Sequence, residues 1–115
     1  MPILKLETDV PIPEGSRAGL LSSLSRVVAE TTRKPERYVM VTLSPASTIM
    51  SGGEGGSAFV DIRSIGGLDD PANRLLSRNV CQLLKDSLGI PPERTYLNFT
   101  DISAGHWGWN GDTFG

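Results

Sequence analysis

The sequence is poor in the residues that most often carry reactive chemistry. Cys81 is the only cysteine, so no disulfide can form within the chain, and its apolar helical neighbours predict a small core residue. His106 is the only histidine, which excludes a metal site built from several histidines. A Ser-His-Asp triad would have to use this one residue, and no nucleophile-elbow pattern accompanies it. The sequence therefore gives little support for a disulfide-based redox site, a histidine metal site or a Ser-His-Asp hydrolase.

Long apolar runs and blocks of like charge are also missing. The first ten residues include Lys5, Glu7 and Asp9, which interrupt any run long enough for a signal peptide or a membrane span. Eleven basic and thirteen acidic residues are spread along the chain, for a net charge of −2 and without a basic tract. We therefore expect a cytoplasmic protein that binds neither nucleic acid nor membranes; secretion without a leader stays open.

Periodicity predicts two strand–helix–strand units within a single domain, residues 1–115. The predicted strands are 2–8, 38–44, 58–65 and 95–102; the predicted helices are 17–32, with Ser16 as a possible N-cap, and a second one that follows GGLDDPANR and ends at Leu88. Similar proline-containing segments, RKPERY and GIPPERTY, end the two helices. A strand with a tyrosine near its start follows each of them. This pattern indicates an internal repeat of about 55 to 60 residues.

The predicted third strand carries apolar side chains on both of its faces. Ala58, Val60 and Ile62 share one face, whereas Phe59 and Ile65 share the other. Helices on one face of a four-stranded sheet would leave the second face bare. We therefore expect that other copies of the same chain cover it.

The opening segment MPILKLETDV places a proline directly after the initiator Met1. Removal of Met1 would turn Pro2 into a secondary amine, which no other residue type can supply. An α-amino group titrates at about 7.7–8.0, and an apolar pocket with a nearby cation lowers that value. Such an amine would be a neutral base at physiological pH. The alternative is that Pro2 merely starts an edge strand, where its missing N–H costs nothing.

Five segments, in this order and spacing, resemble the macrophage migration inhibitory factor family of the tautomerase superfamily. They are MPILKLETDVP, KPERYVMV, SIGGLDDPANR, CQLLKDSLGIPPERTYLNFTD and GWNGDTFG. The resemblance implies an α/β (α+β) subunit of order β-α-β-β-α-β, with a pseudo-twofold repeat and a four-stranded mixed sheet carrying both helices on one face. It also implies a homotrimer whose sheets form a barrel around a central channel. The implied activity is cofactor-free and metal-free keto–enol tautomerisation of small 2-oxo acids, phenylpyruvate or dopachrome-type compounds, with Pro2 as the base.

The resemblance further implies roles for residues that line a pocket. Lys34 matches a lysine that holds the substrate carboxylate; taken alone, it is a solvated residue at a helix end. Ile65 matches a position whose backbone N–H meets that carboxylate, and Ser64 is its pocket neighbour. Tyr96 and Asn98, which share one strand face, match residues contributed by the adjacent subunit. Interface packing is the alternative role for Tyr96.

Aromatic residues match the rim of the same pocket. Tyr38, Trp109 and Phe114 correspond to aromatic or apolar positions suited to a phenyl-bearing substrate. Trp107 departs from the family, where a smaller residue such as valine is familiar, and its ring would narrow the pocket, change substrate choice or weaken activity. Without the resemblance, two tryptophans in a tail would indicate subunit packing.

Other departures bear on activities beyond tautomerisation. The CxxC of the vertebrate cytokines reads SAFV here, so thiol–disulfide exchange is not expected. Ile12 and Ala46 occupy the positions of a receptor-binding arginine and aspartate, which puts receptor binding in doubt. One alternative function is a trimeric binding or signalling protein with weak or no tautomerase activity. Another is decarboxylation or dehalogenation of an unsaturated acid, for which Arg33 and Arg37 are available.

Overall fold

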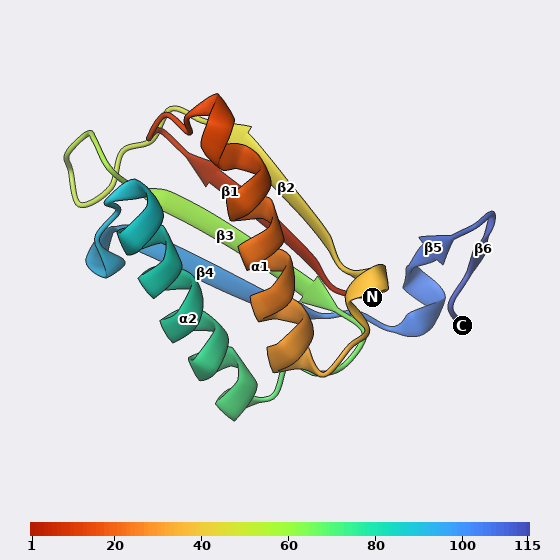
Figure 1. Ribbon diagram of the computed structural model, residues 1–115. Helices are drawn as coiled ribbons and strands as arrows, with labels where there is room; N and C mark the ends of the chain where they lie inside the picture. The colour runs from red at the N-terminus through yellow and green to blue at the C-terminus, as the bar shows by residue number, and fades with distance from the viewer.

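Residues 1–115 form two layers in the computed structural model, a four-stranded sheet and a pair of helices (Figure 1). The main elements are β1 (Ile3–Thr8), α1 (Arg17–Thr32), β2 (Met40–Pro45), β3 (Ala58–Ser64), α2 (Asp70–Leu88) and β4 (Thr95–Asp101). Both helices cover the same face of the sheet (Figure 1). The strand order is β2-β1-β3-β4, in which the outer pairs are parallel and the central β1·β3 pair is antiparallel. The predicted mixed sheet and its twofold repeat are confirmed.

Alternation along each strand decides which side chains the helices cover. Leu4, Leu6 and Thr8 of β1 are buried, whereas Lys5 and Glu7 between them are exposed. The same face of β3 and the apolar stripes of both helices complete the core. Twelve buried residues form it: Leu4, Leu6, Leu20, Leu24, Val28, Ala58, Val60, Ile62, Leu76, Val80, Leu84 and Ile90. Since each large aliphatic side chain contributes about 1.5–3 kcal/mol on burial, this layer supplies the main stabilisation of the fold.

The two helices begin in different ways. The side chain of Asp69 accepts a hydrogen bond from the N–H of Ala72 at 2.9 Å and so caps α2, which ends at the left-handed Gly89. Helix α1 instead follows a 3₁₀ turn, Glu14–Ser16, and the Ser16 side chain makes no capping hydrogen bond. Ser16 does occupy the predicted N-cap position of α1, but its side chain does not cap the helix, because the preceding turn already holds Ser16 in a helical conformation.

The second face of the sheet is open to solvent in the single chain. Phe59 and Tyr96, neighbours across β3 and β4, are 39% and 66% exposed, and Met40 on the edge strand is 59% exposed. The exposed aromatic pair Phe59 and Tyr96 indicates a surface suited to association, whereas Met40 lies apart from this pair, at the other end of the sheet. The predicted assembly would cover this face.

The C-terminal tail forms a small hairpin that projects beyond the sheet on the side of the amino terminus (Figure 1). Its strands are β5 (Gly108–Trp109) and β6 (Asp112–Thr113). The turn residues Asn110 and Gly111 have φ of 53° and 79°, as a two-residue turn with left-handed centres requires. The hairpin brings the end of the chain close to its beginning.

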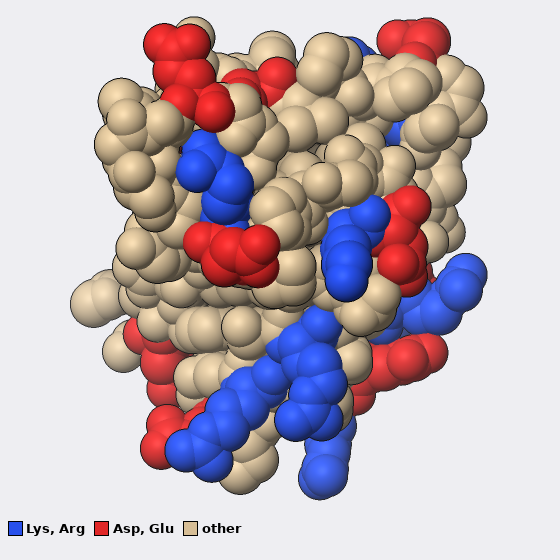
Figure 2. All heavy atoms as spheres, turned by 90° about the vertical axis from the view of Figure 1, so that its left-hand side faces the viewer, with Lys and Arg blue, Asp and Glu red and all other residues tan.

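Charged side chains of both signs occur on the surface at the end of the molecule that carries the β2–β3 loop (Figure 2). Basic side chains gather in the lower part of this view, and acidic ones border them. Neither helix is both long enough and apolar enough to span a lipid bilayer.

Candidate active site

A cavity of about 170 Å³ lies beside the amino terminus. It is lined by Met1, Lys34, Pro35, Tyr38, Ile65, Ala104 and Phe114. These residues come from the start of the chain, the segment after α1, the turn after β3 and the tail. Four of them, Lys34, Tyr38, Ile65 and Phe114, are site residues predicted from the sequence. The fold therefore joins distant segments around the chain's free amine.

Pro2 follows Met1, which lines the cavity, and its side chain is buried. Its carbonyl accepts a hydrogen bond from the N–H of Met40 at 3.0 Å, which ties the chain start to β2. The next residue begins β1, which pairs with β2 on one side and β3 on the other. The edge-strand alternative for Pro2 is therefore wrong, since this proline precedes a central strand. A missing N–H is tolerated there because Pro2 precedes the first residue of the ladder.

The amino group of Met1 has an unusual electrostatic environment. Burial lowers the pKa of this amine below its ordinary value, and the positive charge of Lys34 lowers it further. Both causes disfavour the protonated form. An amine at this place is thus biased towards the neutral state in which it accepts a proton.

Lys34 is placed by an abrupt end of α1. Arg33 adopts a left-handed conformation with φ 59°, and the N–H of Lys34 bonds back to the carbonyl of Ala29 at 3.1 Å. Pro35 follows and prevents the helix from continuing. The Lys34 side chain is half-buried and makes no ion pair. Its ammonium lies 3.7 Å from the position that a Cβ on Gly66 would occupy.

The turn after β3 presents a free hydrogen-bond donor. The N–H of Ile65 bonds to no backbone or side-chain acceptor in the chain. Gly66 and Gly67 have φ of 73° and 80°, and the Gly66 N–H bonds to the Asp101 carboxylate at 2.9 Å. A Cβ on Gly67 would lie 2.8 Å from the Thr32 carbonyl oxygen, so only glycine allows this close approach. An ammonium and a free N–H thus meet at one cavity, a donor set suited to a carboxylate.

Aromatic rings form one wall of the site. Trp109 and Phe114 stack with centroids 5.6 Å apart and an interplanar angle of 9°, and the Tyr38 ring meets both edge-on, at 6.0 and 6.5 Å. The Arg37 guanidinium lies 4.8 Å from the Tyr38 ring centroid. Of these rings, Tyr38 and Phe114 line the cavity, whereas Trp109 packs against both without lining it.

Known proteins resemble this chain over its whole length. The family model described as "Macrophage migration inhibitory factor (MIF)" matches residues 1–115. The chain belongs to the MIF family. The curated MIF of Meriones unguiculatus is 39% identical over 118 residues, covering 99% of each chain, and the MIF homolog of Trichuris trichiura is 38% identical, covering 99% of this chain and 100% of its own. The resemblance that the five segments indicated is thereby confirmed.

Solved MIF structures have the same fold. The homologue from Prochlorococcus marinus superimposes with a TM-score of 0.93 at 38% identity, covering 98% of this chain and 99% of its own. The MIF-like protein from Entamoeba histolytica gives 0.94 at 29% identity, covering 98% of both chains. The predicted MIF-like subunit fold is confirmed.

Tyr96 and Asn98 lie away from the cavity within one chain. Tyr96 pairs with Phe59, which in turn pairs with Glu7, near the far end of β1. At 3.2–3.4 Å per residue, Glu7 is about 16 Å along the strand from Pro2. Both side chains lie on the open face of the sheet, so they would reach such a cavity only from another copy of the MIF-family chain.

Two further predicted residues also lie outside the cavity. The Ser64 side chain is buried on the helix side of the sheet, and its hydroxyl has no hydrogen-bond partner. Trp107 lines a separate hollow with His106, so in the single chain it does not narrow the cavity. Sequence reasoning missed Pro35 and Ala104. Pro35 follows Lys34 in a matching segment, whereas no pattern singles out Ala104.

The one thiol lies far from this chemistry. Cys81 is buried in α2, as predicted. Burial raises the pKa of its thiol, and a hydrogen bond with Ser77 opposes that effect only in part. Cys81 therefore behaves as a small core side chain. The structure also holds no group of three or more His, Cys, Asp or Glu residues arranged for a metal ion.

Proposed function

We propose that the protein is a keto–enol tautomerase of small aromatic 2-oxo acids such as phenylpyruvate or dopachrome-type compounds. One observation carries the proposal: a single cavity joins the amino terminus, the Lys34 ammonium and the free N–H of Ile65. The lowered pKa of the terminal amine and membership of the MIF family support the same class of reaction. No cofactor takes part.

The base is the amine of Pro2, freed by removal of Met1. With Met1 attached, the Pro2 nitrogen is an amide and cannot accept a proton. The Pro2 side chain is buried and follows the Met1 amine, whose pKa burial and Lys34 lower, so we expect the same two causes to disfavour the charged form of a free Pro2 amine. It takes a proton from the carbon beside the ketone, and the electron pair moves onto the oxygen. The protonated amine then delivers the proton to that oxygen, and ketonisation is the reverse.

The carboxylate of the substrate fixes the reacting carbon against the base. Lys34 supplies a positive charge and Ile65 an N–H, so the two make charge-assisted hydrogen bonds to the carboxylate oxygens. The aryl group lies against Tyr38 and Phe114, with Trp109 behind them. This orientation would select planar aromatic acids.

A second copy of the chain completes the pocket. Tyr96 and Asn98 on the open sheet face do not line the cavity of their own chain, and the exposed Phe59 is the cross-strand neighbour of Tyr96. In the proposed homotrimer they close the cleft of the adjacent subunit, where Asn98 donates a hydrogen bond to the developing enolate. Trp107 then lies near the subunit boundary. A monomer would therefore be a poor enzyme.

The test starts from the amino terminus. Intact mass spectrometry establishes whether Met1 is removed, and ultraviolet absorbance follows the enol–keto conversion of phenylpyruvate. Pro2→Gly should lower kcat/KM by at least about 10²-fold, the lower range for a general base. Pro11→Gly, an exposed proline, is the matched control and should leave the rate unchanged. Undiminished activity in Pro2→Gly, or full activity with Met1 retained, would overturn the assignment.

A further inference from the structure

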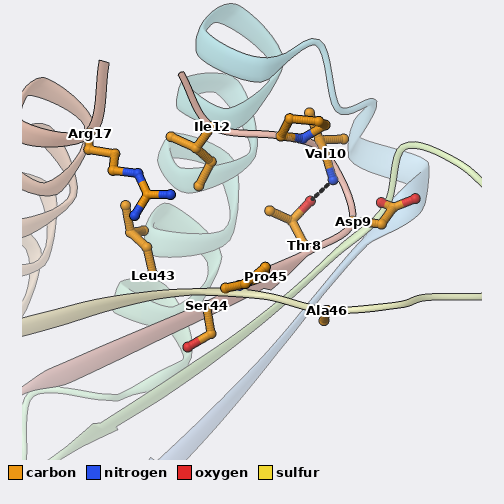
Figure 3. A pocket seen from close by; sticks show the side chains of 10 residues that line it. Thr8, Asp9, Val10, Ile12, Arg17, Leu43, Ser44, Pro45 and Ala46 are labelled. Atoms are coloured by element: carbon orange, nitrogen blue, oxygen red, sulfur yellow. Dashed lines mark hydrogen bonds between the residues drawn. The ribbon is translucent and has the colours of Figure 1, made fainter. Parts of the chain in front are cut away.

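A second cavity, of about 320 Å³, lies at the opposite end of β1 from the amino terminus (Figure 3). The β1–α1 connection and the end of β2 form its walls. Val10, Ile12, Leu43 and Pro45 give it an apolar lining, and Arg17 reaches towards it from the first turn of α1 (Figure 3). Its lining shares no residue with the cavity at the amino terminus. It is therefore a separate candidate binding site.

Two charged side chains, Arg17 and Asp9, lie at this cavity, and only Arg17 is free to bind a ligand. The only acid paired with Arg17 is Glu14, at 3.5 Å, and because Glu14 is 93% exposed, solvent weakens the pair. The Asp9 carboxylate lies at the other end of the cavity (Figure 3) and accepts a hydrogen bond from the N–H of Ser57 at 3.0 Å. The acid is thus engaged by the protein, whereas the guanidinium keeps free donors.

We infer that this cavity binds a small aliphatic carboxylate, with its alkyl chain against Ile12 and Leu43 and its carboxylate on Arg17. A hollow with apolar side chains and a few charged groups, here Arg17 and the already hydrogen-bonded Asp9, is the usual form of a small-molecule site, and about 320 Å³ lies at the small end of the range for such sites. The guanidinium matches the planar geometry of a carboxylate. The inference does not depend on the proposed tautomerase activity.

Nuclear magnetic resonance of the full-length protein tests the inference with hexanoate as the probe. We expect saturable shifts of the amides of Ile12, Leu43 and Ala46, with a dissociation constant on the order of a millimolar, as befits a ligand of eight heavy atoms. 1-Hexanol has the same carbon chain without the charge and should bind at least about 5-fold more weakly. Absence of saturable shifts at these amides, or equal binding of the alcohol, would overturn the inference.

Three variants assign the site. Arg17→Gln should weaken hexanoate binding at least about 5-fold, and Ile12→Ala should weaken it too, because it removes apolar surface that the alkyl chain contacts. Lys34→Gln, in the other cavity, is the matched control and should leave these shifts unchanged. Dispersed amide spectra show that each variant is folded, and phenylpyruvate turnover by the Arg17 and Ile12 variants reports on the proposed enzyme separately. Unchanged binding in Arg17→Gln, or shifts confined to residues around Lys34, would refute the site.

Discussion

The carboxylate of Asp101, at the end of β4, accepts a hydrogen bond of 2.9 Å from the backbone N–H of Gly66, in the turn after β3. A second bond, from the Ile102 N–H to the Ser64 carbonyl, lies beside it, also at 2.9 Å. The two bonds hold the turn that presents the free N–H of Ile65. The proposed carboxylate site thus depends on a side chain that does not line the cavity.

Two replacements of Asp101 should distinguish the effect of its hydrogen bond on substrate binding from the effect of its negative charge. Asp101→Ala removes the acceptor and loosens the turn, so we expect KM for phenylpyruvate to rise about 3- to 10-fold, the equivalent of one hydrogen bond, with kcat little changed. Asp101→Asn keeps an acceptor and removes a negative charge near the substrate carboxylate, so its KM should equal or fall below the wild-type value. Steady-state kinetics measures both, and equal rises in KM would contradict the explanation.

Lys34→Gln should change both the affinity and the pH profile. Loss of the cation should raise KM by roughly 10-fold or more, as expected for a hydrogen bond to a charged group. The Lys34 charge lowers the pKa of the Met1 amine, and we expect it to lower that of a Pro2 amine in the same way, so that removal of the charge raises this pKa while burial still holds it below the ordinary value. The neutral base then forms only at higher pH, so the ascending limb of kcat/KM should move to higher pH. Lys85→Gln on α2 is the control, and an unmoved limb in Lys34→Gln would count against the coupling.

Two neighbouring glycines should differ in their tolerance of a methyl group. In Gly67→Ala the new Cβ would lie 2.8 Å from the Thr32 carbonyl oxygen at φ 80°, and we expect a loss of about 3 kcal/mol in the free energy of unfolding. In Gly66→Ala the nearest atom is the Lys34 ammonium nitrogen at 3.7 Å, so only the backbone cost of about 1 kcal/mol applies. Denaturant unfolding of both variants provides the comparison, and equal losses would refute the packing argument.

Arg33→Gly should stabilise the protein. Arg33 ends α1 in a left-handed conformation with φ 59°, which costs a residue with a Cβ roughly 1 kcal/mol relative to glycine. We expect a gain of up to about 1 kcal/mol and a rise in Tm of about 3–6 °C by thermal unfolding. Arg33→Ala removes the same charge but keeps the Cβ, and it should give no such gain. Equal stabilisation by both would point to charge instead.

Local periodicity was sufficient to predict the elements of the sheet and helices. Burial on one face leaves a period of two or 3.6 in the sequence, and each of the four strands of the main sheet, β1 to β4, lies within two residues of its predicted bounds. The second strand starts at Met40 rather than residue 38 because Glu36–Tyr38 forms a 3₁₀ turn after Pro35. The tail hairpin was missed, although its Asn110-Gly111 pair is the short-range signal for such a turn.

Only those residues of the candidate site that lie within a recognisable local segment could be predicted from the sequence. Lys34 and Ile65 belong to matching segments, and both line the cavity beside the amino terminus. The bond between Asp101 and Gly66 joins residues far apart in the sequence, so no local pattern indicates it. Ser64 was expected beside the substrate, but strand alternation turns its side chain towards the helices.

Strand β1 is hydrogen-bonded along both of its edges, and this has a dynamic consequence. Chain ends are ordinarily among the first parts of a protein to fray, yet here the first residues lead into the middle of the sheet. Their amide hydrogens should exchange with solvent only when the sheet itself opens. The proposed Pro2 base, which directly precedes this strand, would therefore keep a fixed position without the closure of a mobile loop.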